Sequence, residues 1–97
     1  MHADICSALA DPTRILILYL LAEKAHTVGE LTQKLGASQP TTSRHLKILR
    51  ERGLVSATRQ AQTVEYALTD ARIIEALDKL RAVLRDSITQ RANLISE

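Results

Sequence analysis

Residues 38 to 53 read Ser38-Gln-Pro-Thr-Thr-Ser-Arg-His-Leu-Lys-Ile-Leu-Arg-Glu-Arg-Gly53, a polar and cationic stretch with apolar residues at regular spacing. On a helix, Thr42, Leu46 and Leu49 fall on one side and the basic residues fall on the other. Residues 38–62 carry five basic residues and one acidic residue, a net charge of +4 in a chain whose formal charge is +2. This local positive charge on an amphipathic helix indicates contact with a nucleic-acid backbone. A solvated helix face without a partner is the competing interpretation.

The residues before this stretch predict a short helix with a defined start and end. Thr27-Val-Gly-Glu30 has the form of a capping box, apolar residues follow at helical spacing, and Gly36 is placed to end the helix. Ser38 or Gln39 is expected to cap the next helix, which Gly53 ends. A short helix, a tight turn and a second amphipathic helix together form the helix-turn-helix pattern.

Three more helices are expected on either side. Residues 2–10 form a short apolar segment that must dock on other elements, because so short a helix is unstable alone. Asp11-Pro12 predicts the start of a helix that runs to about Glu23 and is apolar nearly all round, which indicates burial. Asp70 is expected to cap a long final helix that runs to about residue 95.

Two strands are expected directly after the helix-turn-helix. Apolar residues alternate with polar ones over residues 55–57 and again over 64–68. Residues 59–62 contain neither glycine nor proline, so a longer, mobile hairpin tip is expected between the strands. Such a hairpin is a wing, and its polar tip, with Arg59, Gln60 and Gln62, is placed to touch DNA.

The expected fold is therefore mainly α with a small β-hairpin: four helices, two strands and a final helix in a single winged helix-turn-helix domain, residues 1–97. The helix-turn-helix is expected at about 28–52, the wing at about 54–68 and the final helix at about 70–95. This helix is longer than one small domain can cover and has coiled-coil-like spacing, so we expect a homodimer. The competing interpretation is a helix packed entirely on its own subunit. The residues expected in the dimer interface are Ile5, Leu9, Ile73, Leu77, Leu80, Leu84 and Ile88.

Composition argues against several other classes of protein. Tyr19 and Tyr66 are the only aromatic residues, so base stacking of the kind used on RNA and single strands is not expected. The single Cys6, the absence of a signal peptide and a longest apolar run of only residues 15–22 favour a cytoplasmic protein with no membrane partner. No glycine loop, activated nucleophile or metal triad indicates an enzyme. A winged helix that binds only other proteins remains the alternative function.

Four motifs follow one another along the chain: Leu9-Ala-Asp-Pro-Thr-Arg14, Gly29-Glu-Leu31 through Leu35-Gly36, Ser38-Gln-Pro-Thr-Thr-Ser-Arg-His-Leu-Lys47 and Leu49-Arg-Glu-Arg-Gly-Leu-Val55. Together they resemble the ArsR/SmtB family of bacterial and archaeal winged-helix repressors, over nearly the whole chain. The resemblance implies a dimer that binds operator DNA and releases it when a metal, metalloid or other signal arrives. Its recognition helices would enter major grooves roughly 34 Å apart on a near-palindromic duplex.

The resemblance also assigns the DNA-reading positions. They match Ser38, Gln39, Pro40, Ser43 and Arg44, with Thr41 and Lys47 beside them. Gln39 suits adenine and Arg44 suits guanine, because both side chains can bond a base at two points. Lys47, Arg50 and Arg59 are better suited to phosphates, which hold the register without reading sequence.

Two residues of this helix have a structural alternative. His45 lies nearer the apolar side than Arg44 does, so it either contacts DNA or packs against the protein. Thr42 stands where the family usually has a larger apolar residue, and it is expected to bury its methyl group.

The two familiar metal sites of the family lack their ligands here. Thr27 and Gly29 occupy the positions of a Cys-x-Cys pair, and neither supplies a thiolate. The positions of the second site, on the final helix, are occupied by Asp70, Arg72, about Val83 and Asp86. Carboxylates without imidazoles make a poor zinc site, so no metal cofactor is expected and the effector is unknown.

One further pair of residues suits a sensor. His2 and Cys6 are four residues apart and would share a helix face, so the two pairs of a dimer could hold a metal, or Cys6 could be oxidised. The simpler interpretation is that Cys6 is a small buried residue in the interface. His26, which precedes the capping box, is expected to be solvated.

Overall fold

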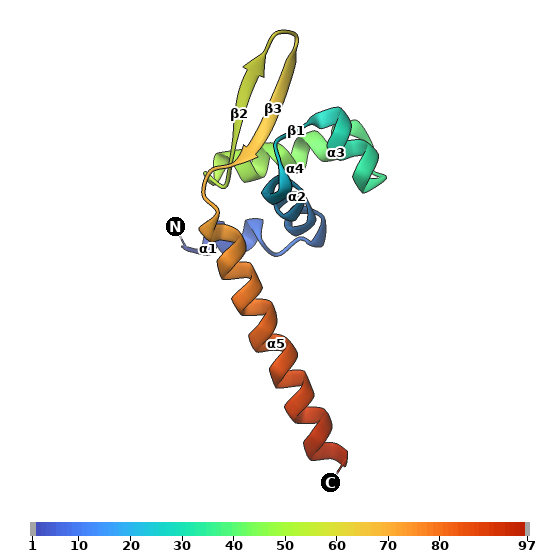
Figure 1. Ribbon diagram of the computed structural model, residues 1–97, viewed down its shortest axis with the longest axis vertical. Helices are drawn as coiled ribbons and strands as arrows, with labels where there is room; N and C mark the ends of the chain where they lie inside the picture. Colours follow the sequence, from blue (N-terminus) through green and yellow to red (C-terminus); the bar gives the residue numbers. More distant parts are fainter. Residues whose placement is uncertain (1, 97) are drawn as a thin grey trace.

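The computed structural model describes the backbone of residues 2–96 and the side chains of residues 5–88. Along this part of the chain the elements are α1 (His2–Ala8), α2 (Pro12–Glu23), β1 (His26–Thr27), α3 (Val28–Leu35), α4 (Gln39–Glu51), β2 (Val55–Gln60), β3 (Thr63–Leu68) and α5 (Arg72–Ser96). Helices α1 to α4 gather in the middle, the β2–β3 hairpin projects at one end and α5 projects at the other (Figure 1). The mainly helical winged helix-turn-helix expected from the sequence is confirmed.

Two of the helices begin at the caps that the sequence predicts. The Asp11 carboxylate accepts the backbone N–H groups of Thr13 at 2.8 Å and Arg14 at 3.2 Å. Desolvation raises the pKa of this carboxyl, but the two N–H groups outweigh it and hold the pKa below its ordinary value. Ser38, one of two expected candidates, caps α4 by accepting the N–H of Thr41 at 3.3 Å.

Helix α3 is also defined by local chemistry. Thr27 and Glu30 form the reciprocal capping box, with bonds of 3.2 Å from the Glu30 N–H and 2.9 Å from the Thr27 N–H. Gly36 ends α3 with a φ of 67°, and Gly53 follows α4 with a φ of 77°. Glycine adopts this left-handed conformation without the steric cost that other residues bear, so both helices stop where expected.

The hydrophobic core lies where α2 crosses α3 and α4, and each of the five helices contributes to it. Its buried members are Ala8, Ile17, Leu18, Leu21, Leu31, Leu46, Leu49, Leu54, Val55 and Leu77. Thr42 is fully buried as well, and its hydroxyl donates to the Ser38 carbonyl at 3.0 Å. The prediction that Thr42 is structural is confirmed, and α4 is held to the core along one side.

The sheet has one strand more than the sequence predicts. β1 pairs antiparallel with β3, which also pairs with β2, so the strand order is β1-β3-β2. His26 lies opposite Tyr66, and Thr27 lies opposite Glu65. Two residues are too short for an alternating pattern, so this strand becomes visible only through its partner.

The hairpin tip is tighter than expected. β2 continues to Gln60 and β3 begins at Thr63, and these two residues pair directly. Only Ala61 and Gln62 form the turn, with Ala61 at a φ of 55°. The prediction of a longer tip from residues 59–62 is wrong, because alanine tolerates here a left-handed conformation for which glycine would be the usual signal.

His26 is fully buried, so the expectation that it is solvated is wrong. Its Nδ1 lies 2.7 Å from the Lys24 carbonyl oxygen, and its Nε2 lies 3.1 Å from Lys34 Nζ. A carbonyl only accepts, so Nδ1 carries the proton and Nε2 accepts from the lysine. The pairing of β1 with β3 buries this side chain, and both of its nitrogens are satisfied.

Replacing His26 with alanine is expected to lower the free energy of unfolding by about 2–4 kcal/mol, because it leaves a cavity and removes two hydrogen bonds. Urea denaturation measures this loss. Lys34→Met removes only the Nζ donor, so it should cost about 1 kcal/mol. Equal stability of His26→Ala and the wild-type protein would contradict the assigned role.

Asp70 lies two residues before α5, whereas Asp11 and Ser38 directly precede their helices. Its carboxylate accepts the Arg72 N–H at 2.9 Å and pairs with the Arg72 guanidinium at 2.6 Å. The side-chain bond from Arg72, together with its backbone N–H, lowers the pKa of Asp70 from 3.8 to about 2. A lowered pKa stabilises the fold above the unfolded value, and that stabilisation is lost as the pH falls through about 2.

Arg72→Met is therefore expected to return the pKa of Asp70 toward 3.8. Titration of the carboxyl carbon by NMR measures the change. The two proteins should differ in stability near neutral pH and converge below the lowered pKa. An Asp70 that titrates identically in both would contradict the assigned ion pair.

Candidate nucleic-acid interface

One face of α4 is buried and the opposite face is exposed. Ser43, Arg44, Lys47 and Arg50 are exposed along the helix, and Gln39 and Pro40 are exposed in its first turn. The structure thus places these predicted DNA-reading and phosphate residues together on a rigid helix, whose other side is fixed by the core. Such an arrangement lets the helix enter a groove without losing its internal packing.

Arg44 is oriented by its neighbours. Its Nη2 donates to the Thr41 hydroxyl at 3.2 Å, and the Ser38 hydroxyl donates to the same oxygen at 2.9 Å. Ser38 is exposed and Thr41 is half-buried. The cap of α4 and the arginine are therefore joined through one threonine hydroxyl.

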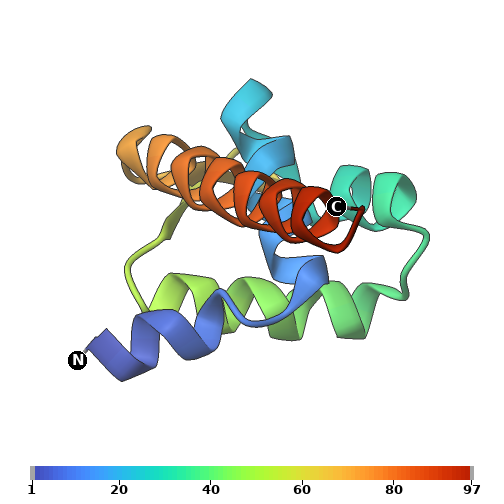
Figure 2. The same cartoon turned by 90° about the horizontal axis from the view of Figure 1, so that it is seen from below.

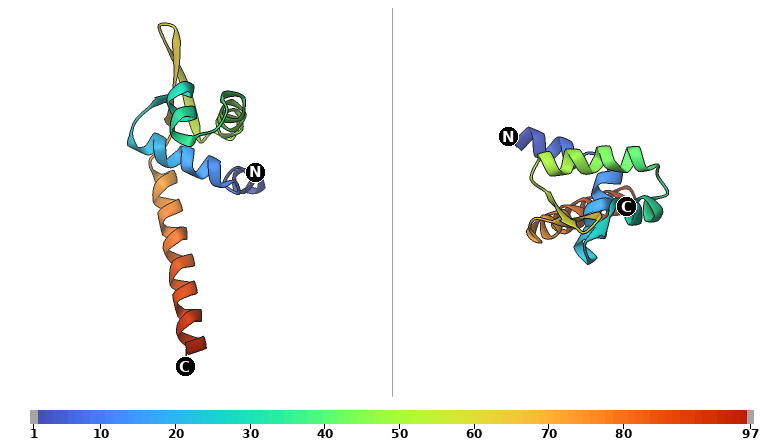
Figure 3. Two further views of the ribbon diagram at one scale, coloured as in Figure 1. Left: turned by 90° about the vertical axis from the view of Figure 1, so that its right-hand side faces the viewer. Right: turned by 90° about the horizontal axis from the view of Figure 1, so that it is seen from above.

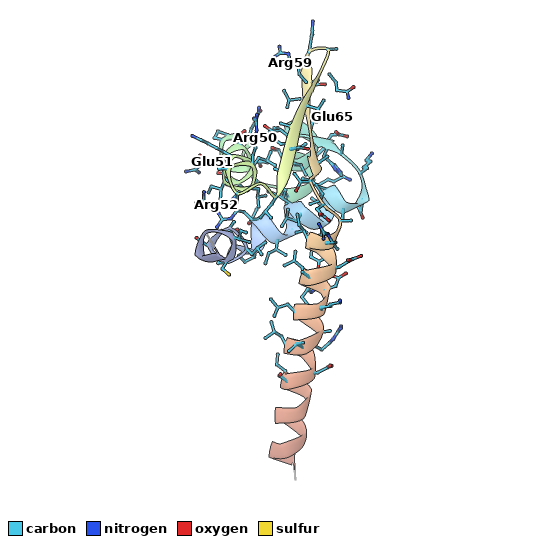
Figure 4. The ribbon with its side chains drawn as sticks, turned by 90° about the vertical axis from the view of Figure 1, so that its left-hand side faces the viewer. Arg50, Glu51, Arg52, Arg59 and Glu65 are labelled. Carbon is cyan, nitrogen blue, oxygen red and sulfur yellow. The ribbon has the colours of Figure 1, made fainter. Side chains whose placement is uncertain are left out.

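The wing adds a second polar surface. Arg59, Gln60 and Gln62 are all exposed at or beside the hairpin turn. Figure 4 shows Arg59 near the tip of the hairpin and Arg50 on α4, both away from the projecting end of α5. Helix and hairpin thus both carry positive charge on the part of the molecule away from the projecting end of α5.

His45 is half-buried, whereas Arg44 beside it is exposed, and its ring contacts α2. Its Nδ1 lies 3.3 Å from Arg14 Nη1. Arg14 also donates through Nε to the Ala8 carbonyl at 2.7 Å and through Nη2 to the Ser7 carbonyl at 3.1 Å. Of the two roles left open for His45, packing is observed, and DNA contact stays a prediction.

Arg14 is absent from the predicted site residues. A sequence signal existed, since Arg14 ends the first motif of the family resemblance, but its target on α4 is distant in the chain. Beside it the structure has a hollow of about 280 Å³, lined by Arg14, Thr41, Arg44, His45 and Ile48. Figure 2 and the right-hand view of Figure 3 show α1 running alongside α4 on this side.

The predicted dimer residues fall into two groups. Leu80, Leu84 and Ile88 are 55–65% exposed, and Ile5 is exposed on α1. Val83, which was not predicted, is 59% exposed beside them. Leu80, Val83, Leu84 and Ile88 form an apolar stripe on α5, which projects away from the other helices (Figure 3).

The other three predicted dimer residues pack in the chain's own core. Leu77 is buried, and Leu9 and Ile73 pack against the core cluster. Tyr19 fixes this part of α5, since its hydroxyl donates to Asp78 at 2.5 Å and its ring lies 5.3 Å below the Arg81 guanidinium. Leu77 therefore offers little surface to a partner.

The candidate sensor is only partly described. Cys6 is exposed on this single chain, and the His2 side chain lies outside the described residues. Among the residues that the structure describes, no three His, Cys, Asp or Glu side chains lie close enough to hold a metal ion. None of the helices described has the length and apolar character needed to cross a membrane.

Comparison with known proteins gives consistent results. The model of the family "Bacterial regulatory protein, arsR family" matches residues 11–57. The biofilm growth-associated repressor of Xylella fastidiosa is 35% identical over 81 residues, which are 84% of this chain and 71% of the relative. The crystal structure of Rv0081 from Mycobacterium tuberculosis superposes with a TM-score of 0.86 at 35% identity, over 94% of this chain and 92% of that one.

A second similar structure is described as a homodimer. It is the winged helix-turn-helix DNA-binding domain Mb0332 from Mycobacterium bovis, a possible ArsR-family transcriptional regulator. The TM-score is 0.78 at 27% identity, over 87% of this chain and 78% of that one.

Proposed function

The chain belongs to the arsR family of bacterial regulatory proteins, and from this premise we propose that it is a homodimeric transcriptional repressor of a near-palindromic operator. The observation that carries the proposal is the exposed basic face of α4, held from behind by a buried face and flanked by a wing with a basic tip. A helix so placed fits the major groove of double-stranded DNA, while a hairpin beside it reaches the adjacent backbone.

The proposed roles follow from side-chain chemistry. Arg44 and Gln39 read bases, because a guanidinium matches guanine and an amide matches adenine at two points each. Lys47, Arg50 and Arg59 bind phosphates, where a positive charge is sufficient. The rest of the interface consists of Ser38, Pro40, Thr41, Ser43, Gln60 and Gln62.

The exposed stripe of α5 supports the homodimer. An apolar helix face of this length on a monomer normally marks an interface. Two copies joined through α5 would place two recognition helices on neighbouring turns of the duplex, so a two-fold operator suits the assembly.

The two familiar metal sites of the family have other residues at their ligand positions in this chain. Thr27 and Gly29 give the first family metal site no thiolates, and Arg72 beside Asp70 supplies no imidazole to the second. We therefore propose that the protein works without a resident metal at these positions.

Selection of bound duplexes from a random pool tests the function. A selected palindrome is the expected result. Repeating the selection with zinc, arsenite or an oxidant, and with Cys6→Ser, identifies the class of signal by the condition that abolishes binding. Absent or salt-insensitive binding would favour the protein-interaction alternative instead.

Lys47→Ala is expected to weaken binding to selected and random duplexes alike and to lower the salt slope of log affinity by about one per subunit, because one phosphate contact is lost. Filter binding at several salt concentrations measures both quantities. Lys79→Ala removes the same charge from an exposed position on α5 and should leave DNA binding unchanged. A loss confined to the selected sequence would contradict the phosphate role of Lys47.

A further inference from the structure

The guanidinium of Arg14 joins three helices. Arg14 belongs to α2. Its guanidinium donates to the carbonyls of Ser7 and Ala8 in the last turn of α1 and to the ring of His45 on α4. The carbonyls at the end of a helix have no partner within that helix, so the arginine satisfies them. Arg14 thereby ties the end of α1 to the helix that carries the reading residues.

The same contact determines which ring nitrogen of His45 carries the proton. A guanidinium only donates, so Nδ1 of His45 accepts and cannot carry a proton in this arrangement. The ring proton is then on Nε2, which becomes a hydrogen-bond donor. This tautomer is opposite to that of His26, whose Nδ1 donates to a carbonyl.

The hollow beside these groups has the chemistry of an anion-binding site. Arg14, Arg44, Thr41, His45 and Ile48 line it, so two arginines and a histidine stand beside a largely apolar surface. None of these described lining residues is acidic. The nearby Asp11 carboxylate is already engaged by the first N–H groups of α2.

We propose that this hollow seats one phosphate of the operator backbone, and that Arg14 is a positioning residue which holds His45 in the Nε2–H tautomer so that it donates to that phosphate. The proposal rests on the proposed function and deepens it. Phosphates line both edges of the major groove, and the hollow lies on the flank of the helix proposed to enter that groove. A free phosphate has the same chemistry, so the experiment separates the two sources.

The tautomer is measured first, without DNA. In protein with ¹⁵N-labelled histidine, long-range proton–nitrogen spectra of the wild-type protein should show His45 protonated on Nε2 alone. Arg14→Met removes every donor but keeps an apolar stem, and it should give a mixture of both tautomers. A mixture in the wild-type protein, or no change in Arg14→Met, overturns the positioning role.

DNA binding is measured next with two matched replacements of His45. The glutamine amide places its N–H near the position of Nε2 and the asparagine amide near that of Nδ1. His45→Gln should therefore bind the selected duplex within about threefold of the wild-type protein, whereas loss of a charge-assisted bond in His45→Asn should weaken binding about tenfold. Equal binding by both variants overturns the donor role.

Arg14 is tested in the same assay. Arg14→Met should weaken binding to the selected and the random duplexes alike by about tenfold. The slope of log affinity against log salt concentration should fall by about one per subunit. Arg14→Lys keeps the charge but loses the planar guanidinium. It should therefore keep the salt dependence of binding while His45 shows a mixture of both tautomers. Arg72, an exposed arginine at the start of α5, supplies the charge-matched control Arg72→Met. If Arg14→Met binds DNA as well as Arg72→Met does, the proposed phosphate site is wrong.

Two further arms separate the possible failures. Inorganic phosphate titrated without DNA should not shift the His45 nitrogen signals, whereas the operator should; saturation by millimolar phosphate alone would overturn the backbone assignment in favour of a free anion. A wild-type protein that retains no duplex would overturn the proposed function itself. If the wild-type protein binds the duplex and the Arg14 and His45 variants bind it equally well, only this inference is overturned.

Discussion

Leu84→Asp is expected to convert the protein to a monomer and to lower operator affinity by about 100-fold or more, since the two half-sites are then no longer bound by one linked molecule. Leu84 is 55% exposed at the centre of the apolar stripe of α5. An aspartate there would bury an unpaired charge in the interface. Sedimentation measures the assembly, and titration with a full operator and with a single half-site measures the affinities.

Lys79→Asp is the control for Leu84→Asp. It introduces the same carboxylate on the same helix, about 140° around the axis from Leu84, so the protein should remain dimeric and bind normally. Binding to an isolated half-site should be nearly unchanged in both variants. A dimeric Leu84→Asp protein with full operator affinity would show that the stripe is not the interface.

Arg44→Ala is expected to remove base discrimination at one position of each half-site, a loss of about 1–3 kcal/mol per half-site. The guanidinium is exposed and oriented by the Thr41 hydroxyl, so it is prepared for a two-point contact. The ratio of affinities for the selected and random duplexes measures the loss. An unchanged ratio would contradict the reading role.

Arg44→Lys separates charge from geometry. Lysine keeps the positive charge but lacks the planar fork, so random duplex should bind nearly as before while the selected duplex loses its advantage. Thr41→Val removes the hydroxyl that orients Arg44 and should reproduce part of this loss. These outcomes distinguish a base reader from a general phosphate contact.

The features that the sequence predicts correctly depend on residues close together in the chain. Asp11 and Thr27 cap their helices through N–H groups two or three residues away, and Gly36 ends α3 through its own backbone. The buried side of α4, including Thr42, follows from helical spacing alone. Local spacing therefore accounts for most of the fold and for the exposed face of the recognition helix.

Apart from the hairpin tip, whose turn depends on the local conformation of Ala61, the errors concern contacts between distant segments. His26 is buried because β1 pairs with β3, and Leu77 is buried because α5 begins against the core. The role of Arg14 depends on His45, which is 31 residues further along the chain. No pattern within one helix or strand predicts such contacts, because each depends on how separate elements meet.

Thr27 has two structural positions at once, as the last residue of β1 and as the cap of α3. β3 is hydrogen-bonded to β1, so a force on the hairpin is transmitted through the sheet to the first turn of the helix-turn-helix. The pairing of β1 with β3 therefore restrains the angle between the hairpin and α4. We expect a duplex whose groove does not match that angle to bend on binding, so that its stiffness affects the affinity and base pairs that the protein does not touch contribute to operator choice.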